Sequence, residues 1–150
     1  AAVLDVKYMV KSNSTTGVHS YGSINGIPSM LLERGGMGLC LKEDVRAYKK
    51  DLYSVLNKMK IMISEEELKE EMPIDITEAN YLEALNEGCW TSFVEAGKLI
   101  SKGQLLGEVT DFFGNVIDKY YAEFDGVVMY KTVALAVTKD SPLVAYGKLK

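Results

Sequence analysis

The sequence has few of the residues on which several classes of site depend. It has one histidine, His19, and two widely separated cysteines, Cys40 and Cys89, so neither a disulfide framework nor a cysteine-rich zinc site is indicated. No apolar run approaches the roughly 20 residues needed to span a bilayer. The net charge of −4 argues against nucleic acid, whose phosphates attract clustered Lys and Arg. We therefore expect a cytoplasmic protein that binds neither nucleic acid nor membrane.

Two common catalytic patterns are also missing. There is no G-x-S-x-G elbow for a nucleophilic serine, and only one histidine is present to serve as its base. The run "ERGGMG" lacks the Lys-Ser/Thr of a phosphate-binding loop and the full G-x-G-x-x-G spacing. We interpret its glycines, Gly35, Gly36 and Gly38, as residues for tight turning.

The first ten residues, "AAVLDVKYMV", have no initiator methionine, no basic region and no cleavage site, so they do not form a signal peptide. They indicate the end of a helix, Ala1 to Val6, and then a strand, Lys7 to Val10. Since a natural chain rarely begins in this way, we expect a fragment of a longer parent protein. Residues 11–23 are small, hydroxylated and interrupted by glycine, which is typical of a loop.

The next elements are typical of a layered α/β domain. The continuously apolar run "SMLLE", residues 29–33, predicts a strand covered on both faces. Residues 43–60 are predicted to form a helix, because their apolar positions follow a 3.6-residue period: Val45, Tyr48, Leu52, Val55, Leu56 and Met59. We assign 1–63 to the end of an α/β domain. Residues 64–73 form an acidic linker in which Ser64 and Glu67 have the spacing of a capping box.

Residues 74–150 have a different pattern. Short strand-length runs alternate with turn signals, which predicts an all-β domain. The segments "ISKGQLLGEV" (100–109) and "VTKDSPLVAY" (137–146) repeat the order of a β-branched residue, a hydroxylated residue, Lys, a tight turn and Leu. This echo predicts two similar hairpins related by a pseudo-twofold axis in a small sandwich.

Glu33 is the main candidate catalytic residue, and the residue pattern leaves two interpretations open. It can be a solvated carboxylate at the end of a strand. Alternatively it is a general base at the carboxyl end of a sheet strand, where open α/β sheets gather their sites. Partial desolvation at such a position raises the pKa of a carboxyl group and suits it to proton transfer at neutral pH.

The β domain resembles the barrel-sandwich hybrid of biotinyl and lipoyl carrier domains. In those domains a modifiable Lys lies at a hairpin tip roughly a dozen residues before the glycine that corresponds to Gly126. Here the tip is Phe113-Gly114-Asn115 and has no Lys, while Lys119 lies too close to Gly126. The resemblance therefore implies the fold without the carrier function.

Three stretches together resemble the succinylglutamate desuccinylase/aspartoacylase family, zinc-dependent deacylases related to the zinc carboxypeptidases. "NGIPSMLLERGGMG" is similar to the family strand that ends in the catalytic glutamate. "LYSVLNKMKIM" resembles the last helix of the catalytic domain. The stretch from Gly88 to Val128 resembles the β domain that follows. The fold expected is thus the end of a zinc-carboxypeptidase-like sheet with flanking helices, followed by an all-β barrel-sandwich-hybrid-like domain.

The resemblance implies that the parent is a zinc-dependent hydrolase of N-acyl amino acids, with Glu33 as general base and then general acid. It makes His19, Tyr21 and Arg34 candidate substrate-binding residues, and Phe112 and Phe113 candidate contributors from the β domain. Arg34 is also placed to pair with Glu33 and lower its pKa.

The sequence departs from the family in one important respect. The family's zinc ligands, an H-x-x-E motif and a later His, have no counterpart among these 150 residues. We therefore expect Zn²⁺ in the parent only, no metal ligand in this chain, and no activity from the chain alone. An unpaired sheet edge predicts a homo-oligomer. The alternative is a non-catalytic ligand-binding or scaffold module with a lipoyl-like β domain.

Overall fold

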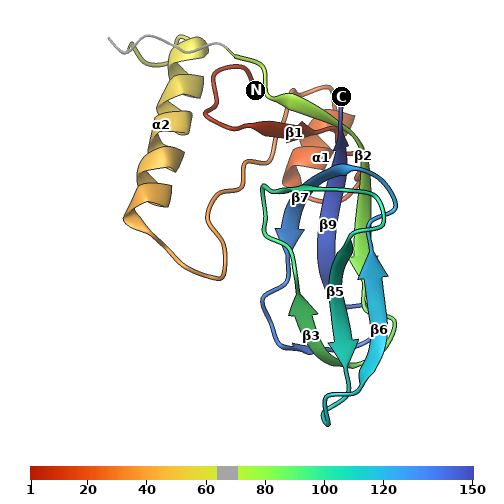
Figure 1. Ribbon diagram of the computed structural model, residues 1–150. Coiled ribbons are helices and arrows are strands. Elements are labelled where there is room, and N and C mark those ends of the chain that lie inside the picture. Colours follow the sequence, from red (N-terminus) through yellow and green to blue (C-terminus); the bar gives the residue numbers. More distant parts are fainter. Residues whose placement is uncertain (64–70) are drawn as a thin grey trace. The chain divides into compact units, whose positions relative to one another are not determined.

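The computed structural model describes residues 1–63 and 71–150, and the chain is an α/β fold that divides into two compact units, Ala1–Asp75 and Ile76–Lys150 (Figure 1). The capping box predicted at Ser64 and Glu67 lies outside the described residues. The limits assigned to the two domains and the linker stay a prediction.

The first unit contains β1 (Tyr8–Val10), α1 (Val18–Ile24) and α2 (Lys42–Lys58). The predicted helix over 43–60 is confirmed as α2. Glu43 and Asp44 lie in its first turn and Lys58 in its last, an arrangement that the helix dipole favours. The strand predicted over Lys7 to Val10 is confirmed as β1.

Three predictions for the first unit are wrong. Residues 1–6 form a turn, closed by the Leu4 N–H on the Ala1 carbonyl, because so short a segment cannot repay helix nucleation. The loop predicted over residues 11–23 contains most of α1. Residues 29–33 are not a strand, because a strand requires a hydrogen-bonded neighbour and no described strand pairs with them.

The glycine-rich run after Glu33 turns tightly, as predicted. Gly35 and Gly38 have φ of 75° and 67°, in the left-handed region that glycine occupies without steric cost. The Leu39 N–H donates to the Gly36 carbonyl across the turn. The run therefore reverses the chain between the Glu33 segment and α2.

From residue 74 onward the described chain consists of strands and turns, which confirms the predicted change of character. The strands are β2 (Ile74–Glu83), β3 (Gly88–Ser92), β4 (Leu99–Ile100), β5 (Leu105–Thr110), β6 (Val116–Tyr121), β7 (Gly126–Lys131), β8 (Ala136–Val137) and β9 (Pro142–Leu149). In one sheet β2, β9, β7 and β4 are neighbours, and in the other the order is β6-β5-β3-β8. The described residues form no closed barrel, so the barrel-sandwich-hybrid fold stays a proposal.

The two sequence segments that echo one another form equivalent turns, but the prediction that they are hairpins is wrong, because β4 pairs with β7 and β8 pairs with β3 instead of with the strand that follows each. Gly103 N–H donates to the Ala122 carbonyl, and the Ala122 N–H donates to Gln104. In the second copy, Asp140 N–H donates to the Ala84 carbonyl, and the Ala84 N–H donates to Ser141. Each segment passes from one sheet to the other, β4 to β5 and β8 to β9. These two short connections thus link the two sheets.

The hydrophobic core lies within the second unit. Trp90 packs edge-on against Tyr120, with ring centroids 5.6 Å apart and planes at 84°. Leu106, Val109 and Leu143 are fully buried beside them. Burial of such side chains contributes about 1.5–3 kcal/mol each to folding, as an upper estimate. This unit therefore has a core of its own.

Candidate functional site

Glu33 lies in an extended segment between α1 and α2, and its side chain is exposed. The carboxyl group of Glu33 is therefore not partly shielded from water in the described chain, as it would be at the end of a strand covered on both faces. The reason is the same as for the missing strand: no described element covers this side of the segment. What the first unit does fix is the backbone on both sides of Glu33.

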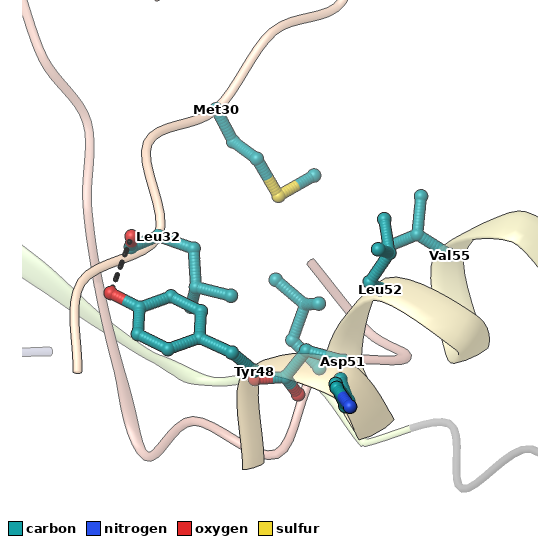
Figure 2. Close-up of a pocket in the computed structure, with 8 residues that line it drawn as sticks. Met30, Leu32, Tyr48, Asp51, Leu52 and Val55 are labelled. Atoms are coloured by element: carbon teal, nitrogen blue, oxygen red, sulfur yellow. Dashed lines mark hydrogen bonds between the residues drawn. The ribbon is translucent and has the colours of Figure 1, made fainter. Parts of the chain in front are cut away.

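The hydroxyl of Tyr48, on α2, bridges the two residues that flank Glu33. Its oxygen accepts a hydrogen bond from the Arg34 N–H at 2.8 Å. The same hydroxyl donates to the Leu32 carbonyl at 3.3 Å (Figure 2). One side chain thus holds the peptide groups before and after the glutamate.

Arg34 pairs with Asp51 of α2, so the predicted pair between Arg34 and Glu33 is wrong. Arg34 Nε lies 2.6 Å and Nη2 2.5 Å from Asp51 Oδ2. Asp51 is 1% exposed, and a buried carboxylate requires a paired cation and further hydrogen bonds. The buried Asp51 therefore competes successfully with the exposed Glu33 for the guanidinium.

The remaining contacts tie this ion pair to the amino-terminal turn. Asp51 Oδ1 accepts a hydrogen bond from the Asp5 N–H at 2.9 Å. Arg34 Nη2 donates to the Asp5 carbonyl at 2.7 Å. Three segments, around residues 5, 34 and 51, therefore meet at one polar cluster.

Beside this cluster lies an apolar pocket of about 400 Å³ (Figure 2). Met30 and Leu32 approach it from the extended segment, and Leu52 and Val55 from α2; Leu4, Tyr48, Lys49 and Asp51 complete its lining. Glu33 does not line the pocket, because alternate side chains of an extended segment point in opposite directions. The pocket is thus a packing face of the segment, and the glutamate is directed away from it.

The predicted substrate-binding residues are not gathered in one place. His19 and Tyr21 lie on α1, where the ring of His19 is half-buried and contacts the Ser20 hydroxyl through Nε2 at 3.2 Å. Tyr21 is 72% exposed. Two residues apart on a helix, they lie on different faces. Arg34 is held by Asp51 of α2. A substrate-binding role for His19, Tyr21 and Arg34 stays a prediction.

Phe112 and Phe113 lie at the tip of the β5–β6 hairpin in the second unit and are 78% and 93% exposed. Asp111 organises this tip: its carboxylate accepts from the N–H groups of Phe113 and Asn115 and from the Asn115 side chain, each at 2.8 Å. The hydrogen bond from the Asn115 side chain is the largest of several that lower the pKa of Asp111. The tip therefore presents two aromatic rings on an ordered turn.

Tyr48 and Asp51 were not among the candidate residues derived from the sequence. Asp51 is a charged residue directly before Leu52 and one turn after Tyr48, on the helix face that carries the apolar stripe. A carboxylate at such a position is seldom buried without a partner. This signal identifies Asp51 as a paired residue, although it does not name Arg34.

The described residues contain no group of three or more His, Cys, Asp and Glu side chains arranged to hold a metal ion. They do not fit a complete zinc site of the kind that the family resemblance implies. In the part of the chain that the structure describes, no helix is both long and apolar enough to cross a membrane.

No family model matches the sequence, and no curated protein matches it. Solved structures do match. The product-bound ectoine utilization protein EutE (DoeB) from Ruegeria pomeroyi has a TM-score of 0.84 at 20% identity, over 98% of this chain and 47% of that one. Succinylglutamate desuccinylase/aspartoacylase from Rhodobacter sphaeroides gives 0.77 at 20% identity, over 95% and 45%. An aspartoacylase family protein from Mesorhizobium loti gives 0.67 at 14%, over 95% and 43%.

The chain thus spans a little under half the length of these structures, and nearly all of it is covered in each comparison. The resemblance predicted from the three sequence stretches is confirmed at the level of the fold: this chain has the fold of part of a succinylglutamate desuccinylase/aspartoacylase family protein.

Proposed function

We propose that this chain supplies the general base to a zinc-dependent hydrolase that deacylates N-acyl amino acids. The observation that carries the proposal is the coincidence of two results. The fold likeness covers 95% or more of the chain in the structures named above, and the motif "NGIPSMLLERGGMG" carries Glu33 at the end of its apolar run. A likeness of fold alone would leave the activity open.

The reaction is the addition of water across an amide bond. The water oxygen bonds to the carbonyl carbon, the carbon–nitrogen bond breaks, and one water proton moves to the leaving amine. Glu33 would accept that proton as the water attacks and then deliver it to the nitrogen. Its exposed carboxylate and its fixed backbone suit a group that has to reach a substrate from a defined place.

Zinc dependence is part of the proposal, although the described residues do not complete a zinc site. The ligands would come from residues outside this chain, since the matching structures are about twice as long. We therefore derive no step through the metal. His19, Tyr21 and Arg34 stay candidates for substrate binding, and a cytoplasmic location and a homo-oligomeric assembly stay predictions.

The experiment is the variant Glu33→Ala in the parent protein. Hydrolysis of N-acyl amino acids should fall about 10²- to 10⁴-fold, because a general base is lost. Bound zinc, measured by plasma mass spectrometry, should be unchanged. The matched control is Glu43→Ala, an exposed glutamate in the first turn of α2, which should retain full turnover. Near-normal turnover of Glu33→Ala would refute the proposal.

The alternative is a non-catalytic ligand-binding or scaffold module with a lipoyl-like β domain. The two proposals differ in what the isolated chain and the parent do. Under the hydrolase proposal the isolated chain neither binds zinc tightly nor turns over substrate, whereas the parent does both. A parent that binds no zinc would favour the scaffold module, and tight stoichiometric zinc on the isolated chain would contradict our assignment of the ligands.

A further inference from the structure

We propose that Tyr48 and Asp51 are positioning residues that hold Glu33 in place through the residues on either side of it. The inference rests on the proposed function for its catalytic consequence. Its structural content, a two-point attachment of the Glu33 segment to α2, stands on the contacts of the first unit alone.

The first point of attachment is the Tyr48 hydroxyl. It accepts a hydrogen bond from the Arg34 N–H and donates one to the Leu32 carbonyl. No described strand pairs with this segment, so the tyrosine hydroxyl provides the hydrogen bonds that a neighbouring strand would otherwise make with these two peptide groups. The side chains of Leu32 and Met30 face α2 and line the apolar pocket (Figure 2). This packing leaves Glu33 on the opposite side of the segment.

The second point is the ion pair of Arg34 with Asp51. Asp51 lies one helical turn after Tyr48, so both groups project from the same face of α2. A guanidinium held through Nε and Nη2 by one carboxylate is fixed in orientation as well as in charge. Arg34 Nη2 also donates a hydrogen bond to the Asp5 carbonyl, and the Asp5 N–H donates one to the other carboxylate oxygen of Asp51.

The arrangement has two consequences for Glu33. Its main chain is fixed immediately before and after the residue, which limits the positions that the carboxylate can reach. The positive charge of Arg34 is also held by Asp51 instead of by Glu33. The carboxylate is thus held near one place and is not paired with the adjacent guanidinium, as a group that has to meet a substrate in a defined geometry requires.

The first test uses the 150-residue chain and does not depend on activity. Amide hydrogen exchange followed by NMR should show the Arg34 N–H exchanging about tenfold faster in Tyr48→Phe, since it loses its acceptor. Tyr53→Phe is the matched control: Tyr53 lies on the same helix, is 49% exposed and is outside this network. An unchanged Arg34 exchange rate in Tyr48→Phe would overturn the attachment.

The second test uses the parent protein and a double-mutant cycle with Glu33→Ala. Tyr48→Phe should lower kcat about tenfold with little change in KM, and Tyr53→Phe should leave both unchanged. In the Glu33→Ala background Tyr48→Phe should have no further effect, because it acts through the glutamate. A merely structural tyrosine would lower turnover equally in both backgrounds, and that result would sink the positioning role.

A third variant, Asp51→Asn, tests the ion pair. It retains an oxygen for the Asp5 N–H and removes the charge that holds Arg34, so kcat should fall more than in Tyr48→Phe. Unchanged kcat in a folded Asp51→Asn protein would remove Asp51 from the proposal. If Glu33→Ala itself retains normal turnover, the proposed function fails, and the exchange measurement on the isolated chain still decides the attachment.

Discussion

Individual side chains in this protein are placed by partners that lie far away in the sequence. Arg34 follows Glu33 directly, yet its guanidinium pairs with Asp51, 17 residues later. Tyr48 reaches back 14 residues to the Arg34 N–H. Tyr146 accepts a hydrogen bond from the Glu123 N–H and another from the Asn80 side chain. In each case a polar group is satisfied by a partner that the local sequence does not identify.

Tyr120 leads to a prediction about pH at the scale of a residue. Burial raises the pKa of its hydroxyl above the ordinary value of 10.0, and its oxygen accepts the Leu85 N–H. Ionising the buried ring is disfavoured, so the unfolded chain loses its proton first as the pH rises. The stabilisation is therefore fully present below about pH 10 and is lost as the pH rises through the folded-state pKa.

The measurement is the free energy of unfolding from urea titrations at pH 8 and above pH 10. In the wild type the free energy of unfolding should be lower above pH 10 than at pH 8. The difference between these two values should be smaller in Tyr120→Phe. Tyr121→Phe, whose ring is 50% exposed on the same strand, should behave as the wild type. An identical pH dependence in Tyr120→Phe would contradict the assignment. Tyr130, whose pKa is also raised by burial, contributes to the slope that remains.

At the scale of elements, some sequence signals depend only on residues close in the chain, whereas others depend on pairing with a distant segment. The helix α2 follows from its period and from the charges at its ends, both local properties. The duplicated turns after β4 and β8 follow from local turn residues, with Gly103 and Asp140 at φ of 81° and 65°. The strand predicted over residues 29–33 failed because a strand is completed only by another strand.

The β5–β6 hairpin provides the prediction at this scale. Asp111 accepts three hydrogen bonds within its turn, so Asp111→Ala should speed amide exchange at Phe113 and Asn115 severalfold while leaving the amides of the buried core unchanged. The readout is residue-resolved hydrogen exchange. Glu87→Ala, an exposed acidic residue in another turn, should change neither. Since the pKa of Asp111 is lowered, the wild-type turn should persist at neutral pH and loosen only as the pH falls through that pKa.

At the scale of the whole molecule, the two units differ in how much they bury. The hydrophobic core of the described chain lies from Ile76 onward, while in the first unit large apolar side chains such as Leu31, Leu52 and Met59 are more than half exposed. Hydrophobic burial is the main favourable term in folding, so the second unit is expected to be the more stable of the two.

The corresponding prediction is that residues 76–150 fold without the rest of the chain. The isolated segment should give a dispersed NMR spectrum and a single cooperative thermal transition. Residues 1–75 alone should lack a cooperative transition. A disordered 76–150 segment would show that its core depends on the first unit. Sedimentation of the full chain tests self-association separately, and a strictly monomeric profile would refute it.

The sequence by itself determined the features that depend on short-range order: the helix near residues 43–60, the change to strands near residue 74, the two duplicated turns and the motif that contains Glu33. Periodicity, turn chemistry and motif spacing are properties of neighbouring residues, so they can be read directly from the sequence. The tertiary structure decided which partner holds Arg34, that Tyr48 bridges the residues flanking Glu33, and that residues 29–33 remain outside a sheet. Ion pairs, hydrogen bonds and strand pairing across long stretches of chain depend on which segments meet in space, and only the folded chain determines that.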